Sequence, residues 1–218
     1  MSEALAALPN NRRSQAERRA STRARLLDAT LQTLTERGYA RTTTLLIEDR
    51  AGVSRGARLH HFPTKAKLMS AAVERLYEGL GERYQRGLEE VSPEADRFRE
   101  GLRLLWQSYL DPMQAAVLEL DLAARHDADL RAQLQQLTGR LHQIVRRHAN
   151  AYFPNLARRD ANGLLEMLQA TMRGLALRRS VHGESPSEER VLDLLEELVK
   201  HRFDSPGQSE RRNGDPHE

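Results

Sequence analysis

Residues 42–62 read TTTLLIEDRAGVSRGARLHHF, and this pattern guides the interpretation of the whole chain. Gly52 permits a tight turn that a Cβ atom would obstruct, and a short helix is predicted on each side of it. Ile47 and Ala51 are expected to face inward from the first of these helices. Ser54 is expected to cap the second helix. Two short helices joined by a glycine turn are typical of a helix-turn-helix.

The rest of the chain is also predicted to be helical, because apolar residues recur at three- and four-residue spacing and no segment has the period of a strand. The first helix is expected to begin at Ser21 or Thr22 and to stop at Gly38 in a left-handed cap. About nine helices are predicted, at approximately residues 21–38, 43–51, 54–62, 65–90, 94–110, 112–125, 127–153, 158–181 and 187–203. The expected fold class is therefore all-α.

Positive charge is concentrated near the N-terminus. The 218 residues carry a net charge of +3, but residues 1–67 contain 13 Lys and Arg against 6 Asp and Glu, which leaves the remainder at −4. A basic segment on a mildly acidic remainder favours contact between a polyanion and the first segment only. Residues 1–20 are expected to form a flexible basic arm. That arm is either a solvated tail or a segment that follows DNA phosphates.

Composition excludes several classes of protein and site. The chain has no cysteine, which excludes a disulfide scaffold, a thiolate metal site and a cysteine nucleophile. No apolar run is long enough for a membrane span or a secretory signal, so a cytoplasmic location is expected. The eight histidines form no HExxH motif, and there is no GxSxG, P-loop or GxGxxG motif. No catalytic residue, metal site or cofactor is therefore predicted.

The N-terminal region resembles a known family. The segments RLLDAT, GYARTTT and AGVSRGARLHHFPTKAKL, within residues 21–73, look like the DNA-binding domain of TetR-family transcriptional regulators. The resemblance implies that the helix after Gly52 enters the major groove of DNA. Arg55 would contact a guanine edge, and Lys65 would contact a phosphate. Carried over by position, the DNA-facing residues are Thr43, Thr44, Arg55, Gly56, Ala57, Leu59, His60, His61 and Lys65.

Three positions depart from the family pattern. Arg58 and Leu59 stand where the family often has Leu-Tyr, so the phosphate bond of a tyrosine hydroxyl is missing, and Leu59 is a candidate to fill the inward space. Glu48 stands where a small alanine usually lets the two helices pack. Glu48 either tilts outward or pairs with Arg50 or Arg58. The docking angle of the recognition helix depends on which of these holds.

The last two predicted helices have unusually wide apolar arcs. A helix of this kind must bury one side on its own domain and another side on something else. We therefore expect a four-helix dimer interface with two helices from each subunit, as the resemblance also implies. The alternative is a larger core within one chain. The candidate interface residues are Leu164, Leu168, Met172, Leu175, Val191, Leu194, Leu195 and Leu198.

Aromatic and apolar residues of the middle helices form either an ordinary core or a chamber for a small-molecule effector. Trp106 and Tyr109 combine aromatic area with one hydrogen-bond donor each, which suits the wall of a pocket. The resemblance supports an effector but identifies none. The candidate lining residues are Phe98, Leu102, Trp106, Tyr109, Met113 and Leu141.

These observations predict four parts: a basic arm at 1–20, a helix-turn-helix domain at 21–67 with its motif at about 43–62, a ligand-binding and dimerisation domain at 68–203, and a disordered tail at 204–218. The predicted function is a homodimeric transcriptional repressor that a small ligand releases from a near-palindromic double-stranded DNA operator. The ligand would shift the long helix 65–90, which its glycines make pliable. The alternative is a helical small-molecule-binding or interaction module with only non-specific DNA binding.

Overall fold

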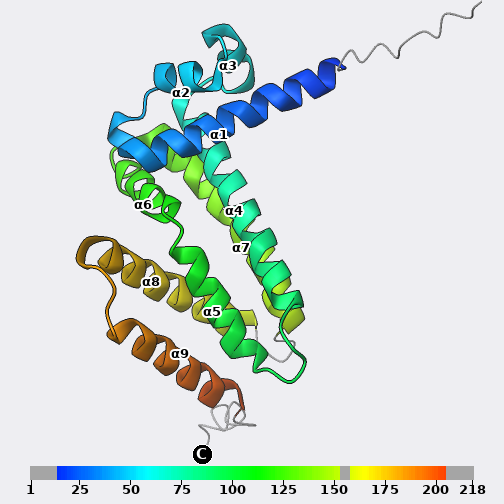
Figure 1. Ribbon diagram of the computed structural model, residues 1–218, viewed down its shortest axis with the longest axis vertical. Helices are drawn as coiled ribbons and strands as arrows, with labels where there is room; N and C mark the ends of the chain where they lie inside the picture. The colour runs from blue at the N-terminus through cyan, green and yellow to red at the C-terminus, as the bar shows by residue number, and fades with distance from the viewer. Residues whose placement is uncertain (1–13, 153–157, 205–218) are drawn as a thin grey trace, which may run out of the picture.

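The computed structural model describes residues 14–152 and 158–204, and this part of the chain contains nine helices and no strand (Figure 1). The all-α prediction and the predicted number of helices are confirmed for it. In chain order the helices are α1 (Gln15–Arg41), α2 (Thr44–Ala51), α3 (Arg55–His61), α4 (Lys65–Glu89), α5 (Arg97–Tyr109), α6 (Met113–Ala123), α7 (Ala128–Tyr152), α8 (Arg158–His182) and α9 (Ser187–Asp204).

The helices form two groups, which are joined by α6 and by the packing of α4 against α5. At the top of Figure 1, α1 crosses the molecule with α2 and α3 beside it, and α4 and α7 run side by side away from α1. Helices α5, α8 and α9 pack together in the lower part. Because α6 packs on α1 as well as on α7 and α8, it links the helix-turn-helix to the C-terminal helices.

Two buried clusters hold these groups together. The larger joins α1, α2, α4, α6 and α7, and its fully buried members include Leu26, Leu34, Ile47, Leu68, Met69, Leu120 and Leu130. The smaller joins α5, α8 and α9 and consists of Leu102, Trp106, Tyr109, Leu168, Met172 and Leu195. Each large apolar side chain removed from water contributes roughly 1.5–3 kcal/mol. The helix-turn-helix therefore shares one core with the helices that follow it.

Helix α1 begins earlier than the sequence analysis predicted. The Ser14 hydroxyl accepts a hydrogen bond from the Glu17 N–H at 3.1 Å, and the Glu17 carboxylate accepts one from the Ser14 N–H at 2.7 Å. This capping box satisfies two N–H groups that a helix start leaves unpaired. The predicted start at Ser21 or Thr22 was wrong, because the Ser-x-x-Glu signal was missed. Residues 15–20 are therefore helical, and the remainder of the predicted arm, residues 1–13, lies outside the described residues.

Gly38 interrupts α1 as predicted, although in a different conformation. Its φ of 72° and ψ of 170° are outside the helical region, and the helix ends three residues later at Arg41. Glu119 of α6 lies against this break, and its Oε2 accepts a hydrogen bond from the Tyr39 N–H at 2.6 Å. A Cβ atom at position 38 would lie 2.6 Å from that oxygen. Glycine is thus required both for the backbone conformation and for the contact with α6.

Helix α4 is continuous, so the glycines predicted to soften it do not break it. The structure gives Gly87 another role. A Cβ atom there would lie 2.7 Å from Cδ2 of Leu104 on α5. The missing side chain therefore allows α4 and α5 to approach closely.

The described C-terminal end of the chain differs slightly from the prediction. Asp204, placed in the disordered tail by the sequence analysis, is the last residue of α9. The rest of that predicted tail, residues 205–218, lies outside the described residues. No helix within the described ranges is both long and apolar enough to span a bilayer.

Candidate nucleic-acid interface

The helix-turn-helix forms through the local signals that its sequence carries. The Thr43 hydroxyl caps α2 by accepting the Leu46 N–H at 3.3 Å, and the Ser54 hydroxyl caps α3 by accepting the Ala57 N–H at 3.2 Å. Gly52, with φ 58° and ψ 43°, supplies the left-handed residue between the helices. These polar caps fix where each short helix begins.

Arg25 of α1 holds the turn in place, a role that the sequence analysis missed. Its guanidinium donates hydrogen bonds to the carbonyl oxygens of Ala51 and Gly52, the latter at 2.7 Å. The last carbonyl groups of a helix have no partner within the helix, so a guanidinium from a neighbouring helix satisfies them. No local signal distinguishes Arg25 from the other N-terminal arginines, since its partners lie 26 and 27 residues further along the chain.

A buried ion pair connects α2 with α3. Nε of Arg58 donates to Oε1 of Glu48 at 2.8 Å, and the two residues are 6% and 7% exposed. The same guanidinium donates to the carbonyl oxygen of Phe62 at 3.1 Å. Of the two partners considered for Glu48, the structure selects Arg58, because Arg50 pairs with Glu36 instead.

This pair also corrects the prediction for Leu59. That side chain was a candidate to fill the inward space, but it is 40% exposed. Arg58 takes the inward position because Glu48 compensates its charge there. Glu48 and Arg58, which both depart from the family pattern, are therefore the two partners of one ion pair.

The outer face of α3 presents most of the residues predicted to meet DNA. Arg55, Gly56, Leu59 and His60 are exposed, and no atom lies within 4 Å of a Cβ built at Gly56. Ala57 and His61 are half-buried, and Ala57 packs against the larger core. The face is therefore smooth at Gly56 and carries polar side chains on both sides of it.

The remaining predicted contacts lie beside α3. Thr43 is exposed at the start of α2, and Thr44 is half-buried. Nζ of Lys65 lies 4.2 Å from the ring centroid of Tyr39, an arrangement in which a cation meets an aromatic face. Burial lowers the pKa of Lys65, and Asp127 opposes this effect.

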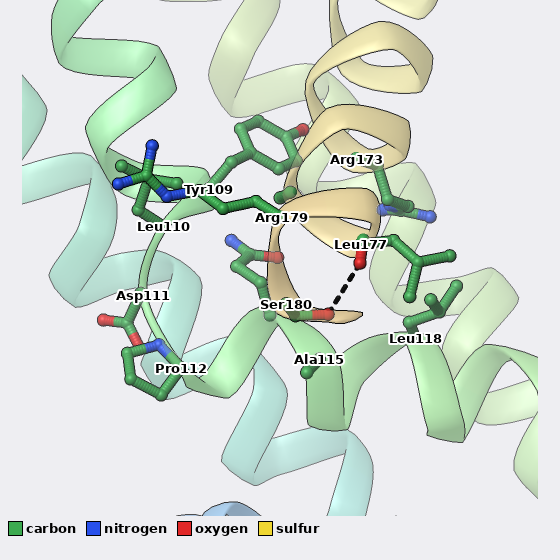
Figure 2. A pocket seen from close by; sticks show the side chains of 12 residues that line it. Tyr109, Leu110, Asp111, Pro112, Ala115, Leu118, Arg173, Leu177, Arg179 and Ser180 are labelled. Atoms are coloured by element: carbon green, nitrogen blue, oxygen red, sulfur yellow. Dashed lines mark hydrogen bonds between the residues drawn. The ribbon is translucent and has the colours of Figure 1, made fainter. Parts of the chain in front are cut away.

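A hollow of about 330 Å³ lies between the α5–α6 corner and α8. Figure 2 shows its walls, which are formed by Tyr109, Leu110, Asp111, Pro112, Gln114, Ala115, Leu118, Arg173, Ala176, Leu177, Arg179 and Ser180. We call it the α8 hollow. Most of its lining is apolar, and polar groups from α8 lie at its edge.

Of the six residues proposed from sequence for an effector chamber, Tyr109 lines the α8 hollow. Leu102 and Trp106 are buried against α8 and α9, and Met113 belongs to the larger core. Phe98 is half-buried on α5 and does not line the hollow, and the side chain of Leu141 lies outside the described part of the structure. The aromatic pattern on α5 marked a core face, because α8 and α9 cover that face.

The charged groups at the α8 hollow are paired. Arg173 donates to Asp121 at 3.0 Å, and Arg179 donates to Glu188 at 2.7 Å. Burial raises the pKa of Asp121, while Arg173 opposes this effect. Burial also raises the pKa of Tyr109. A compound in the hollow would meet apolar walls and two guanidinium groups that already have partners.

The residues proposed for a dimer interface divide into two sets. Leu168, Met172 and Leu195 are buried within the chain, and three others, Leu164, Leu175 and Val191, are half-buried beside them. Leu194 and Leu198 of α9 are 40% and 59% exposed. The large apolar residues of α8 that are exposed are Met167, Leu177 and Val181. The wide apolar arcs therefore serve the chain's own core on one side and remain uncovered on the other.

The described side chains include no group of three His, Asp or Glu residues that could hold a metal ion.

Comparison with known proteins then identifies the architecture. Residues 26–72 match the family described as bacterial regulatory proteins, tetR family, and residues 98–204 match the C-terminal domain of BetI-type transcriptional repressors. The transcriptional regulator CymR of Pseudomonas putida is 35% identical over 194 residues, which cover 88% of this chain and 96% of CymR.

The chain belongs to the TetR family. A second relative, the uncharacterized HTH-type transcriptional regulator Mb2936c of Mycobacterium bovis, is 30% identical over 192 residues, covering 86% of this chain and 97% of that protein. Among solved structures, the regulator SCO7518 of Streptomyces coelicolor has a TM-score of 0.63 at 24% identity, with 82% and 98% of the two chains covered. That likeness supports the TetR fold.

Membership of the TetR family makes this protein a DNA-binding transcriptional regulator and not an enzyme. TetR-family regulators bind DNA and act as dimers with small-molecule effectors. Within this family, α3 occupies the position of the recognition helix, since it is the second helix of the matched helix-turn-helix.

Proposed function

We propose that this TetR-family regulator is a cytoplasmic repressor that binds a near-palindromic operator as a homodimer and is released from it by a small molecule. The observation that carries the proposal is the exposed face of α3, with Arg55 beside a bare Gly56. A guanidinium that reaches a guanine edge contributes about 1–3 kcal/mol of discrimination. The missing side chain at residue 56 allows the helix to lie close to the bases.

The internal pairing of Glu48 supports sequence-specific reading over the alternative of a module with only non-specific binding. A carboxylate directed outward would repel phosphates, but the Glu48 carboxylate accepts a hydrogen bond from Arg58 inside the domain. The pair also joins α2 to α3 at their crossing. A rigid crossing is what a recognition helix needs in order to present its residues at one angle.

Dimerisation is proposed through the uncovered sides of α8 and α9. Leu194 and Leu198 lie four residues apart on α9, so they share one face of that helix. Exposed apolar residues grouped on neighbouring helices are typical of an interface. Two copies joined there would present two α3 helices, as a palindromic operator requires.

The α8 hollow is proposed as the effector site. Its volume of about 330 Å³ fits a small organic molecule. A related multidrug binding protein, EbrR, has been solved with proflavin; it is 25% identical to this chain with a TM-score of 0.54, and the match covers 81% of this chain and 99% of EbrR. This supports a similar class of ligand here.

Helix α6 offers a route from the α8 hollow to DNA. Ala115 and Leu118 line the hollow, and the next residue, Glu119, accepts the Tyr39 N–H of α1. A compound that displaces α6 would move this contact, and with it α1, the helix on which α2 packs. A compound that binds more tightly to the displaced arrangement of α6 than to the undisplaced one supplies the free energy that releases the protein from DNA. This route is an alternative to the predicted shift of α4, whose glycines lie within one continuous helix.

The test begins with selection of bound sequences from random duplex DNA, followed by fluorescence anisotropy with the selected operator and a scrambled duplex. We expect a preference for the operator that Arg55→Ala reduces and that the exposed control Arg103→Ala on α5 leaves unchanged. Equal affinity for both duplexes at physiological salt would overturn sequence-specific repression and support the alternative.

Effector binding has a separate test. Compounds are screened for release of the operator complex, with proflavin as the first probe. Ala115→Trp, which narrows the α8 hollow, should abolish release while operator affinity is retained. Release that survives this substitution would place the effector site elsewhere.

A further inference from the structure

A basic groove lies between the first turns of α1 and the exposed side of α3. It is open to solvent, has a volume of about 370 Å³ and is lined by Gln15, Arg18, Arg19, Thr22, Ala57, His60 and His61. We call it the α1–α3 groove. It exists because the capping box at Ser14 and Glu17 starts α1 early enough to carry two arginines alongside α3.

The charge of the α1–α3 groove is uncompensated within the described part of the chain. No carboxylate belongs to its lining, and the acid nearest in sequence, Glu17, is engaged with the Ser14 N–H. The ion pairs described for residues 14–152 and 158–204 include none with Arg18 or Arg19. A groove of this size with two guanidinium groups and two imidazoles is suited to a phosphate.

We propose that a DNA backbone phosphate enters the α1–α3 groove and that His61 takes up a proton when it does. This rests on the proposed DNA-binding function and extends the contact surface from α3 to α1. A phosphate beside the recognition helix would fix the register of the protein on the duplex without reading its sequence.

The groups around His61 determine whether its imidazole is protonated. Burial lowers its pKa below the ordinary value of 6.5, and the neighbouring His60, Arg19 and Arg23 lower it further. The guanidinium of Arg23 is held close by, 5.7 Å from the ring centroid of Phe62. With burial around it and the arginines of α1 beside it, a charged imidazole is disfavoured in the free protein. His61 is therefore neutral at pH 7 before DNA arrives.

A bound phosphate makes the charged form of the His61 imidazole favourable. Its negative charge offsets Arg18, Arg19 and Arg23 and accepts a hydrogen bond from the protonated imidazole, so the pKa of His61 is higher in the complex than in the free protein. The complex then binds more protons than its separate components. DNA affinity must rise as pH falls from the bound-state pKa toward the free-state pKa, and this gain is lost as pH rises above the bound-state pKa.

The groove is tested through salt dependence. Anisotropy titrations of the full chain are made on a scrambled duplex at several salt concentrations, because a phosphate contact is independent of sequence. Arg18→Ala with Arg19→Ala should lower the slope of log affinity against log salt by about 0.9, the value for one phosphate. The control Arg103→Ala should leave the slope unchanged. An unchanged slope in the double variant would overturn the groove contact.

The proton is tested by repeating the titrations between pH 5.5 and 8.5. We expect affinity of the wild type to rise by up to about tenfold per pH unit for one proton. His61→Asn should flatten this dependence, whereas His60→Asn and the distant His126→Asn should keep it. Dependence that persists in His61→Asn, or that disappears in His60→Asn instead, would overturn the assignment. Thermal unfolding of each variant confirms that it is folded.

A final arm separates DNA phosphate from free anion. The imidazole resonances of His61 are followed by NMR during addition of inorganic phosphate alone and of duplex DNA. The DNA should raise the pKa of His61 at micromolar concentration, and inorganic phosphate should not. An equal response to both would assign the groove to a free anion. Because scrambled DNA is used throughout, failure of operator selection leaves these tests intact.

Discussion

Nε of Arg58 on α3 donates a hydrogen bond to Oε1 of Glu48 on α2 at 2.8 Å, and the pair is buried at the crossing of the two helices. The sequence departs from the family pattern at both positions. A buried carboxylate or guanidinium alone is costly, but together they satisfy each other, and Arg58 also reaches the Phe62 carbonyl. The crossing angle of this helix-turn-helix is therefore held by an ion pair rather than by apolar contact alone.

Glu48→Ala should destabilise the protein by about 3 kcal/mol, because Arg58 would remain buried without its partner. Combining Glu48→Ala with Arg58→Leu should restore most of the loss, since apolar groups then fill the same space. Urea denaturation measures the free energy of unfolding of the single and the double variant. The matched control, Glu36→Ala, removes an exposed pair with Arg50 and should cost less than about 1 kcal/mol. A double variant no more stable than the single one would contradict this account.

Arg25→Ala should lower stability by about 1 kcal/mol, because the carbonyl groups of Ala51 and Gly52 lose their donor. Operator affinity should fall as well, since the turn between α2 and α3 is then no longer hydrogen-bonded to α1. Anisotropy and urea denaturation report the two effects. Arg37→Ala, on the same helix, is the control. If affinity were unaltered, Arg25 would matter only for stability.

Gly38→Ala should destabilise the protein by about 1–3 kcal/mol, because φ is 72° there and the new methyl group would meet Glu119. Gly79→Ala has the opposite expectation: the residue lies within α4, a new Cβ there would make only an ordinary contact with the guanidinium of Arg83 at 3.8 Å, and the change should stabilise by up to about 1 kcal/mol. Thermal unfolding measures the stability of both variants and shows whether one falls and the other rises.

Glu119→Ala should increase the hydrogen-exchange rate of the Tyr39 amide, since that N–H loses its acceptor on α6. If α6 transmits the effector signal, the same variant should bind operator but respond less to a releasing compound. Slow exchange at Tyr39 in the variant would remove the structural basis of this route.

Leu194→Glu with Leu198→Glu should convert the dimer to a folded monomer, because two carboxylates would be buried at the proposed interface. Leu195→Ala lies between them in sequence but in the core, so it should instead destabilise the fold by about 2–5 kcal/mol. Sedimentation velocity and denaturation separate these outcomes. Leu45→Glu, exposed on α2, serves as a surface control. A charged double variant that remains dimeric would place the interface elsewhere.

Helix positions were largely predictable because their signals are local. Gly52 and Ser54 act through a backbone angle and a hydrogen bond within a few residues, and each has the predicted role. The one large error, the start of α1, came from overlooking a signal of the same kind, the capping box that begins at Ser14. The family landmarks are equally local, which is why the helix-turn-helix was recognisable without coordinates.

The pattern alone could not decide partners across the fold: it left Arg50 and Arg58 both open as partners of Glu48. Arg58 and Leu59 are adjacent, yet one is buried and the other exposed because a carboxylate lies 10 residues earlier on α2. Trp106 looked suited to a pocket, but α8 and α9 cover it. Capping and helix periodicity depend on neighbours in the chain, so the amino-acid order sets them. Which face is covered, and which charge finds a partner, depends on helices brought together from distant positions.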